Sequence, residues 1–266
     1  MKIFETAETL HLPDERVWVA GDWHGNAGWV RSVFRAMRRF DDRVETVLQL
    51  GDFWPTEEFL SVLDGEAKLA GFKRVLFLPG NHEPWPLLIQ IEEDLAPGQA
   101  ARISEVVWFL PRPFRFTVAG RRVLALGGAA SVDKHWRTPG RDWWEEELIT
   151  EQHEQAAVAG GPADVMLTHE SPVSAVPEAQ RILDDPPLAF RGEVQQTSAA
   201  QRERVERVWE GVQPKVLLHG HMHVFGDREL DDGRKVISLA CDGMAGNVGV
   251  LDMATLELAP MPLTAF

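Results

Sequence analysis

Five short apolar runs in this 266-residue chain are each followed by a small polar motif rich in Asp, Asn or His. The runs cover residues 16–20, 44–50, 74–78, 164–167 and 215–218. The motifs are Asp22-Trp23-His24, Gly51-Asp52, Gly80-Asn81-His82, Thr168-His169 and Gly220-His221-Met222-His223. A short apolar run that ends in a polar loop is typical of a buried β-strand. Because α/β folds build their sites at one edge of a parallel sheet, we expect the five loops to meet there.

The side chains in these loops form a set that suits divalent metal ions. Besides His82 they comprise two carboxylates, one amide and four imidazoles: Asp22, His24, Asp52, Asn81, His169, His221 and His223. This set holds more donors than one zinc ion takes and about the number that two metals need. Each motif alone would more simply be a turn or a solvent-facing histidine. The prediction of a metal site therefore depends on their recurrence.

Composition narrows the remaining function classes. A formal charge of −14 and the lack of a basic stripe disfavour a duplex nucleic-acid partner. A small phosphorylated substrate stays possible, because two divalent metals would make the site locally positive. Cys241 is the single cysteine, so an intramolecular disulfide is excluded. No apolar stretch is long enough to span a membrane, and residues 1–14 lack signal-peptide features, so we expect a cytoplasmic location.

The order of the predicted elements favours two packed sheets with helices outside them. Helical spacing of apolar residues predicts helices at 28–40, 57–70, 86–95, 144–159 and 198–209. Further strands are predicted at 106–110, 114–118, 122–126, 235–239, 248–252 and 256–260. We expect Glu145–Glu147 to form the acidic first turn of the fourth helix, Ser198 to cap the last, and residues 171–197 to be irregular. No linker is evident, so residues 1–266 are predicted to form one α/β domain.

In their order, the five motifs resemble the pattern of the calcineurin-like metallophosphoesterase superfamily: Asp-x-His, Gly-Asp, Gly-Asn-His, a later His and Gly-His-x-His. The resemblance extends over roughly residues 17–250. It implies a four-layer α/β/β/α sandwich with two packed mixed sheets. It also implies two divalent ions, with manganese the first expectation and iron, zinc, nickel or cobalt the alternatives.

The resemblance further implies a role for each motif residue. The first metal would be held by Asp22, His24 and His223. The second would be held by Asn81, His169 and His221, and Asp52 would bridge both metals. The metals would lower the pKa of a bridging water and so supply hydroxide near neutral pH. His82 would face the scissile phosphate, where it would protonate the leaving oxygen or stabilise developing charge.

Two residues separate this chain from the Ser/Thr protein phosphatases. That branch has Gly-Asp-Tyr-Val-Asp-Arg-Gly at the second motif, whereas Pro55 and Thr56 here replace the Asp that partners the catalytic His and the Arg that grips phosphate. Residues 127–144 are similar to a loop of small stand-alone bacterial and phage members. This makes Arg137 and Arg141 candidate substrate contacts, with a solvated surface loop as the alternative.

The function implied is a phosphodiesterase acting on small or cyclic nucleotide-type diesters. A small-molecule phosphomonoesterase and a non-catalytic metal-binding scaffold are the alternatives, and the retention of His82 favours an enzyme. Trp23, Trp54 and Trp85 lie near the motifs and either pack in the core or stack on a base or aromatic leaving group. His219 has either an ordinary structural place or a role in orienting a metal ligand.

Overall fold

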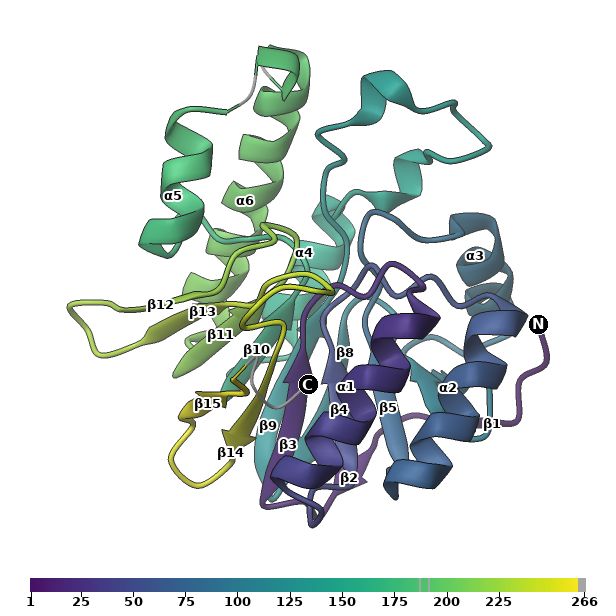
Figure 1. Cartoon of the computed structure of the whole chain (residues 1–266). Coiled ribbons are helices and arrows are strands. Elements are labelled where there is room, and N and C mark those ends of the chain that lie inside the picture. Colours follow the sequence, from purple (N-terminus) through teal and green to yellow (C-terminus); the bar gives the residue numbers. More distant parts are fainter. Residues whose placement is uncertain (187, 191, 263–266) are drawn as a thin grey trace.

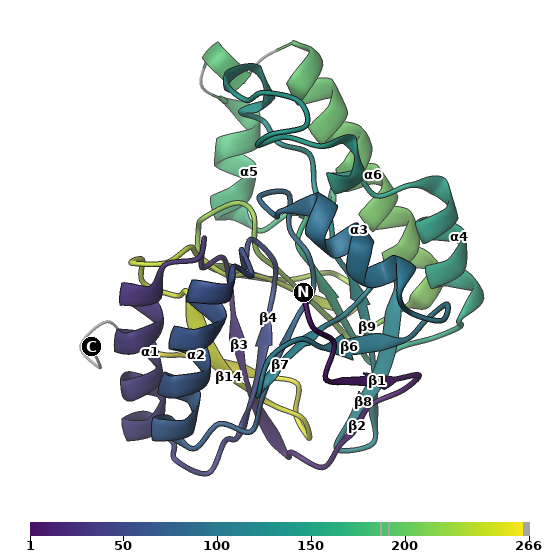
Figure 2. The same ribbon diagram turned by 90° about the vertical axis from the view of Figure 1, so that its right-hand side faces the viewer.

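Two β-sheets packed face to face, with helices against both outer faces, make up the computed structural model of the chain, which describes residues 1–186, 188–190 and 192–262 (Figure 1 and Figure 2). This arrangement confirms the predicted α/β/β/α sandwich of two mixed sheets. No helix in those ranges is both long and apolar enough to cross a lipid bilayer.

The first sheet carries the first three motifs. Its strands follow the order β1 (Glu5–Ala7), β6 (Ala100–Arg102), β7 (Val107–Phe109), β5 (Arg74–Phe77), β4 (Thr46–Gln49), β3 (Arg16–Ala20), β14 (Val248–Asp252) and β15 (Leu258–Pro260). The central strands β3, β4, β5 and β7 are parallel, so their carboxyl ends lie at the same sheet edge. Strands β1, β6, β14 and β15 add antiparallel pairs on either side.

The second sheet carries the last two motifs. Its order is β12 (Gly226–Glu229), β13 (Lys235–Ser238), β11 (Val216–His219), β10 (Val165–Thr168), β9 (Arg121–Leu126), β8 (Phe114–Val118) and β2 (His11–Leu12). The strands β9, β10, β11 and β13 are parallel. The expected hairpin forms between β8 and β9, which pair in antiparallel fashion around Ala119 and Gly120.

Helices cover the two outer faces. The first sheet is covered by α1 (Ala27–Phe40), α2 (Glu57–Ala70) and α3 (Trp85–Glu93) (Figure 2). The second is covered by α4 (Glu151–Ala159) and α6 (Glu193–Val212). Figure 1 shows α5 (Pro177–Asp184) and the first half of α6 standing above the sheets, beside the loop from β9 to α4. We call α5, the short 3-10 helix η3 (Leu188–Phe190) and the first half of α6 the helical cap.

Alternation along the central strands divides the core into three layers. Val17 and Val19 of β3 point between the sheets and contact the inner cluster that includes Leu167 and Leu218 of the second sheet. Trp18, between them in sequence, faces the helices instead. This is the two-residue period expected of strands covered on both faces. Burying each large apolar side chain contributes about 1.5–3 kcal/mol, so the alternation holds the layers in register.

Three sequence predictions were wrong. The predicted helix 144–159 is divided into the 3-10 helix η2 (Glu145–Glu147) and α4, because the Glu147 side chain turns inward and accepts hydrogen bonds from Ser131. Residues 171–197 are not irregular throughout, since they contain α5, η3 and the start of α6. Ser198 does not cap α6, which begins at Glu193.

Candidate metal centre

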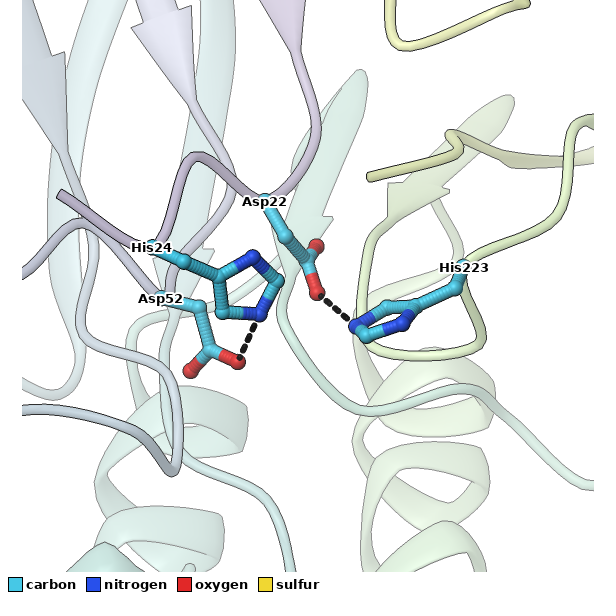
Figure 3. Close-up of side chains that lie close together, drawn as sticks. All are labelled: Asp22, His24, Asp52 and His223. Atoms are coloured by element: carbon cyan, nitrogen blue, oxygen red, sulfur yellow. Dashed lines mark ion pairs between the residues drawn. The ribbon is translucent and has the colours of Figure 1, made fainter. Parts of the chain in front are cut away.

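The five polar motifs meet where the sequence predicted that they would. They follow β3, β4 and β5 of the first sheet and β10 and β11 of the second, each at the carboxyl end of its strand. Figure 3 shows Asp22, His24, Asp52 and His223 converging from both sheets. One ligand atom from each of these four side chains lies within 4.8 Å of the others.

The first group of possible metal-ligand atoms consists of two pairs, each made of an imidazole nitrogen and a carboxylate oxygen. The Nε2 atom of His223 lies 3.0 Å from Oδ2 of Asp22, and Nε2 of His24 lies 3.4 Å from Oδ2 of Asp52 (Figure 3). The first of these pairs joins residues at opposite ends of the chain, one from each sheet. The geometry therefore brings together the three ligands expected for a first metal and the residue expected to bridge.

The second group lies on the other side of Asp52. The Nε2 atom of His169 is 2.9 Å from Oδ1 of Asn81 and 3.3 Å from Oδ1 of Asp52. The ring of His221 is centred 5.1 Å from that of His169. Asp52 thus presents Oδ1 to one group and Oδ2 to the other, and all seven predicted ligands lie in one cluster.

The two carboxylates attract positive charge. Asp22 and Asp52 are almost fully buried, and among the described residues Oδ2 of each has an imidazole nitrogen nearby, from His223 and His24, but no hydrogen bond of good geometry. A buried, unpaired carboxylate oxygen is costly unless a cation or a donor satisfies it. Divalent metals with oxygen and imidazole ligands fit this donor set.

The charge of the cluster shifts three of the histidines toward their protonated forms. Burial opposes protonation, but the neighbouring Asp52 and Asp22 carboxylates outweigh it and raise the pKa of both His24 and His169 to about 9. Burial is outweighed in the same way at His223, where Asp22 raises the pKa to about 11. A metal that binds these imidazoles must displace their protons. The cluster therefore holds positive charge both with and without metal, as metal ions in one case and as protons in the other.

Several of the ligand residues have a strained backbone conformation. His24, Asp52, His221 and His223 have φ values of 48°, 53°, 65° and 54°, in the left-handed region that non-glycine residues rarely adopt. Such residues cost about 1–3 kcal/mol each and persist where the surrounding structure over-determines them. Here the carboxylates help to do so. The His82 N–H donates to Oδ1 of Asp52, and the His221 N–H donates to Oδ1 of Asp22.

Two motif glycines allow the carboxylates to approach the backbone. A Cβ atom on Gly80 would lie 2.2 Å from Oδ1 of Asp52, and one on Gly220 would lie 2.3 Å from Oδ1 of Asp22. Both distances are far shorter than van der Waals contact. Glycine at these positions is therefore required by packing around the ligands, not by a turn.

Hydrogen bonds from outside the ligand set orient two imidazoles. The Nδ1–H of His24 donates to Oδ1 of Asp242 at 2.8 Å, and the Nδ1–H of His169 donates to the Leu50 carbonyl at 2.7 Å. In each case Nε2 is left to face the cluster, as in many metal sites. The sequence analysis missed Asp242, although this residue follows the predicted strand 235–239 just as the other motifs follow theirs.

A second chain of hydrogen bonds orients Asn81. Its Nδ2 group donates to Oγ of Ser131 at 3.1 Å, and the Ser131 hydroxyl donates to Oε2 of Glu147 at 2.7 Å. These contacts fix the amide so that Oδ1 points into the cluster. Neither Ser131 nor Glu147 was predicted, because no motif marks them.

The two candidate substrate arginines differ in position. Nη2 of Arg137 lies 2.7 Å from Nε2 of His82 and 2.7 Å from Oδ2 of Asp133. Arg137 therefore places a positive charge beside the histidine expected to face the phosphate. Arg141 is exposed, and neither arginine is among the described residues that line the cavity above the cluster.

The remaining residues near the motifs contribute mainly to the packing of the fold. Trp23 and Trp85 are fully buried in the layer between the first sheet and its helices, so they pack in the core. Trp54 is half-buried, and the described lining of the cavity above the cluster does not include it. His219 is buried at the end of β11, where its Nδ1–H donates to the Gly220 carbonyl.

Comparisons with known proteins agree with this geometry. No curated protein sequence matches the chain at a significant level. Among solved structures, TT1561 of Thermus thermophilus is similar, with a TM-score of 0.54 and 13% identity over 93% of this chain and 98% of its own. A dimetal phosphatase from Danio rerio has a TM-score of 0.54 and 14% identity, covering 88% of this chain and 91% of its own. At these identities the structures show a common fold.

The family itself is shown at the sequence level. The model described as calcineurin-like phosphoesterase matches residues 15–225, which contain every predicted ligand and most of the chain. The chain therefore belongs to the calcineurin-like phosphoesterase family and is a metal-dependent phosphoric ester hydrolase.

Proposed function

We propose that this protein is a phosphodiesterase that hydrolyses small or cyclic nucleotide-type diesters with two divalent ions, manganese in the first instance. The observation that carries the proposal is the placement of Asp52 between two groups of ligand-type atoms, with one oxygen facing each. A single carboxylate in this position could bridge two cations, whereas an imidazole nitrogen has one lone pair and could bind only one.

Each side of Asp52 then has its own ligands. Asp22, His24 and His223 would hold one ion, and Asn81, His169 and His221 would hold the other. When bound, such ions neutralise phosphate oxygens and lower the pKa of a water so that hydroxide is available near neutral pH. Asn81 adds no charge, so the loaded site keeps a net positive charge that attracts an anionic substrate.

His82 and Arg137 are placed to act on the substrate. His82 lines the cavity above the cluster. The Arg137 guanidinium lies against the His82 ring and also donates a hydrogen bond to Asp133, which holds it there. A phosphate resting on the cluster would meet His82, with the Arg137 guanidinium next to that ring. Arg137 supplies a fixed positive charge there, and His82 supplies a proton or a hydrogen bond as the leaving oxygen departs.

The second motif supports a diester over a phosphoprotein. Thr56, which stands where protein phosphatases carry a phosphate-binding Arg, caps α2 by accepting a hydrogen bond from the Phe59 N–H. Pro55 precedes it and offers no carboxylate. At this position a dianionic monoester therefore lacks the phosphate-binding Arg, and His82 lacks a carboxylate partner from this motif, whereas a monoanionic diester has less need of the Arg.

The proposal is tested by turnover and metal content together. With Mn²⁺ present, we expect bis-p-nitrophenyl phosphate to be hydrolysed at least as well as p-nitrophenyl phosphate. Two ions should bind per chain, and a chelator should abolish hydrolysis. A stoichiometry of one ion or fewer at saturating Mn²⁺ would reject the dinuclear site. Strong preference for the monoester would favour a phosphomonoesterase, and metal binding without hydrolysis of either ester would favour a scaffold.

His82 separates chemistry from metal binding. His82→Ala should lower kcat by about 10²–10⁴-fold while two ions remain bound, because the ring is not among the predicted ligands. If the histidine donates a proton, an alkyl leaving group should lose more rate than p-nitrophenolate, which departs without protonation. Equal losses for both leaving groups would exclude proton donation, and loss of an ion would make His82 a ligand.

A further inference from the structure

A cavity of about 380 Å³ lies between the metal-ligand cluster and the helical cap. This volume falls within the range of sites that enclose a small organic ligand. Its floor is formed by several cluster residues and by His82, so an organic group of a phosphoester held by the cluster could extend into this space.

Most of the wall around the cavity is apolar. Ile182 and Leu183 contribute from α5, Phe190 from η3, Val132 from the β9–α4 loop and Met222 from the last motif. Water against this part of the wall makes few hydrogen bonds, so an apolar group that replaces it there is favoured. The polar part of the wall comes from α6, with Gln195, Ser198 and Arg202, and from Asp133 of the β9–α4 loop.

The cap and the opposite loop meet beside this cavity. The Phe190 ring, which lines it, contacts the Trp136 ring edge to face, with centroids 5.5 Å apart. Trp136 lies in the β9–α4 loop, which also carries Arg137 (Figure 1). Two separate segments thus border the space, and both bring aromatic or aliphatic side chains to it. An edge-to-face pair of this kind strengthens the contact between them.

We propose that this cavity is the subsite for one organic group of the substrate, and that it selects phosphoesters in which that group presents an apolar surface of the size of an aromatic ring. The proposal rests on the proposed function, because it is the cluster that would hold the phosphate. It adds the substrate class that neither the motifs nor the cluster specifies. Selection comes from the area of the group that α5 and η3 remove from water.

The test measures binding, not turnover. Phenylphosphonate and methylphosphonate carry the same phosphorus headgroup and differ in the single organic group, and neither is hydrolysed at its P–C bond by this chemistry. We expect calorimetry with the Mn²⁺-loaded chain to give a dissociation constant about tenfold or more lower for phenylphosphonate. Equal constants, or no binding of either probe, would overturn the proposal.

A matched pair of cap variants locates the effect. Ile182 lines the cavity and is 38% exposed, so Ile182→Asn should fold and should reduce the phenyl-to-methyl preference several-fold. Leu188 lies on the same cap, is 81% exposed and is absent from the described cavity lining, so Leu188→Asn should keep the preference of the parent chain. Equal changes in both variants would overturn the assignment of the subsite to this wall.

These outcomes are distinct from failure of the proposed function. A chain that hydrolyses neither nitrophenyl ester but binds phenylphosphonate selectively would lose the proposed catalysis and keep the subsite. A chain that hydrolyses both esters but binds the two phosphonates equally would keep the catalysis and lose the subsite.

Discussion

Asp52 illustrates how one side chain serves two halves of a site. Its buried carboxylate faces His24 with one oxygen and His169 with the other, and the neighbouring imidazoles hold its pKa well below the usual range against the effect of burial. It is therefore charged at neutral pH. Removal of its negative charge should therefore weaken metal binding on both sides of Asp52.

Asp52→Asn should weaken both metal sites, because the variant has the same shape but no negative charge. We expect at least about a tenfold loss of affinity for each ion, measured by metal titration and elemental analysis. Asp22→Asn is the matched control and should weaken mainly the site that includes His24 and His223. Two tightly bound ions and near-normal turnover in Asp52→Asn would show that the ligand map is wrong.

Glu147, which lies outside the metal-ligand cluster, makes the stability of the folded protein depend on pH. Burial raises its pKa to about 7, with the Ser131 hydrogen bonds acting in the opposite direction, compared with 4.5 for an ordinary Glu. Below pH 4.5 both folded and unfolded states bind the proton. Between pH 4.5 and 7 the unfolded state releases it first, so the free energy of unfolding falls as pH rises, by roughly 3 kcal/mol in full.

Glu147→Gln cannot lose this proton and should not show that fall. In metal-free buffer, the unfolding free energy of the variant relative to the parent should therefore rise between pH 4.5 and 7 and level off above it. Urea denaturation at a series of pH values measures the difference. A difference that stays constant across this window would mean that Glu147 is charged in the folded state.

At the scale of elements, α4 shows how a helix start is decided. Thr150 accepts a hydrogen bond from the His153 N–H, and Nδ1 of His153 accepts one from the Thr150 N–H, which together form a capping box. The cap stands just after Ile149, whose N–H donates to the buried Gln201 side chain of α6. The helix therefore begins where a local cap and a tertiary contact coincide.

Thr150→Ala should cost about 1 kcal/mol of stability, because the first turn of α4 loses its side-chain acceptor. Thr150→Ser keeps a hydroxyl in the same place and should recover most of this loss. Denaturant midpoints of the two variants provide the comparison. If both variants lose the same amount, the methyl group of the threonine, not the cap, is what stabilises the helix.

At the scale of the whole molecule, the candidate ligands reach from Asp22 to His223 and come from both sheets. An unfolded chain cannot bring them together, so metals should bind only to the folded state. This arrangement couples the site to the stability of the entire sandwich. The two carboxylate oxygens that lack hydrogen bonds would gain partners in the same step.

Mn²⁺ should therefore raise the melting temperature, and EDTA should reverse the change. At a free concentration one hundred times the dissociation constant, each site adds about 2.7 kcal/mol to the free energy of unfolding. Asp52→Asn should respond much less over the same range of concentration. A melting temperature that is indifferent to saturating Mn²⁺ would contradict binding at this cluster.

The sequence by itself determined the central strands and the ligand motifs. Their signals are local: an apolar run, a glycine and a short polar loop. Parallel strands place their carboxyl ends at one edge, so Asp22, Asp52 and Asn81 converge without further information. Short edge strands such as β2 (His11–Leu12) and β12 (Gly226–Glu229) escaped prediction, because only pairing with a neighbour makes so few residues a strand.

Only the tertiary structure decided what surrounds the ligands. Asp242 meets His24 across 218 positions, and Ser131 meets Asn81 across 50, so no periodicity in the chain could mark either contact. Glu147 turns inward at the break between η2 and α4, in a segment where local propensity favoured one continuous helix. The cavity likewise joins Val132, Ile182 and Met222 through packing of the cap. The metal-ligand residues can be recognised from short segments of sequence. The side chains that orient these ligands and enclose a substrate come together only through contacts that form when the chain folds.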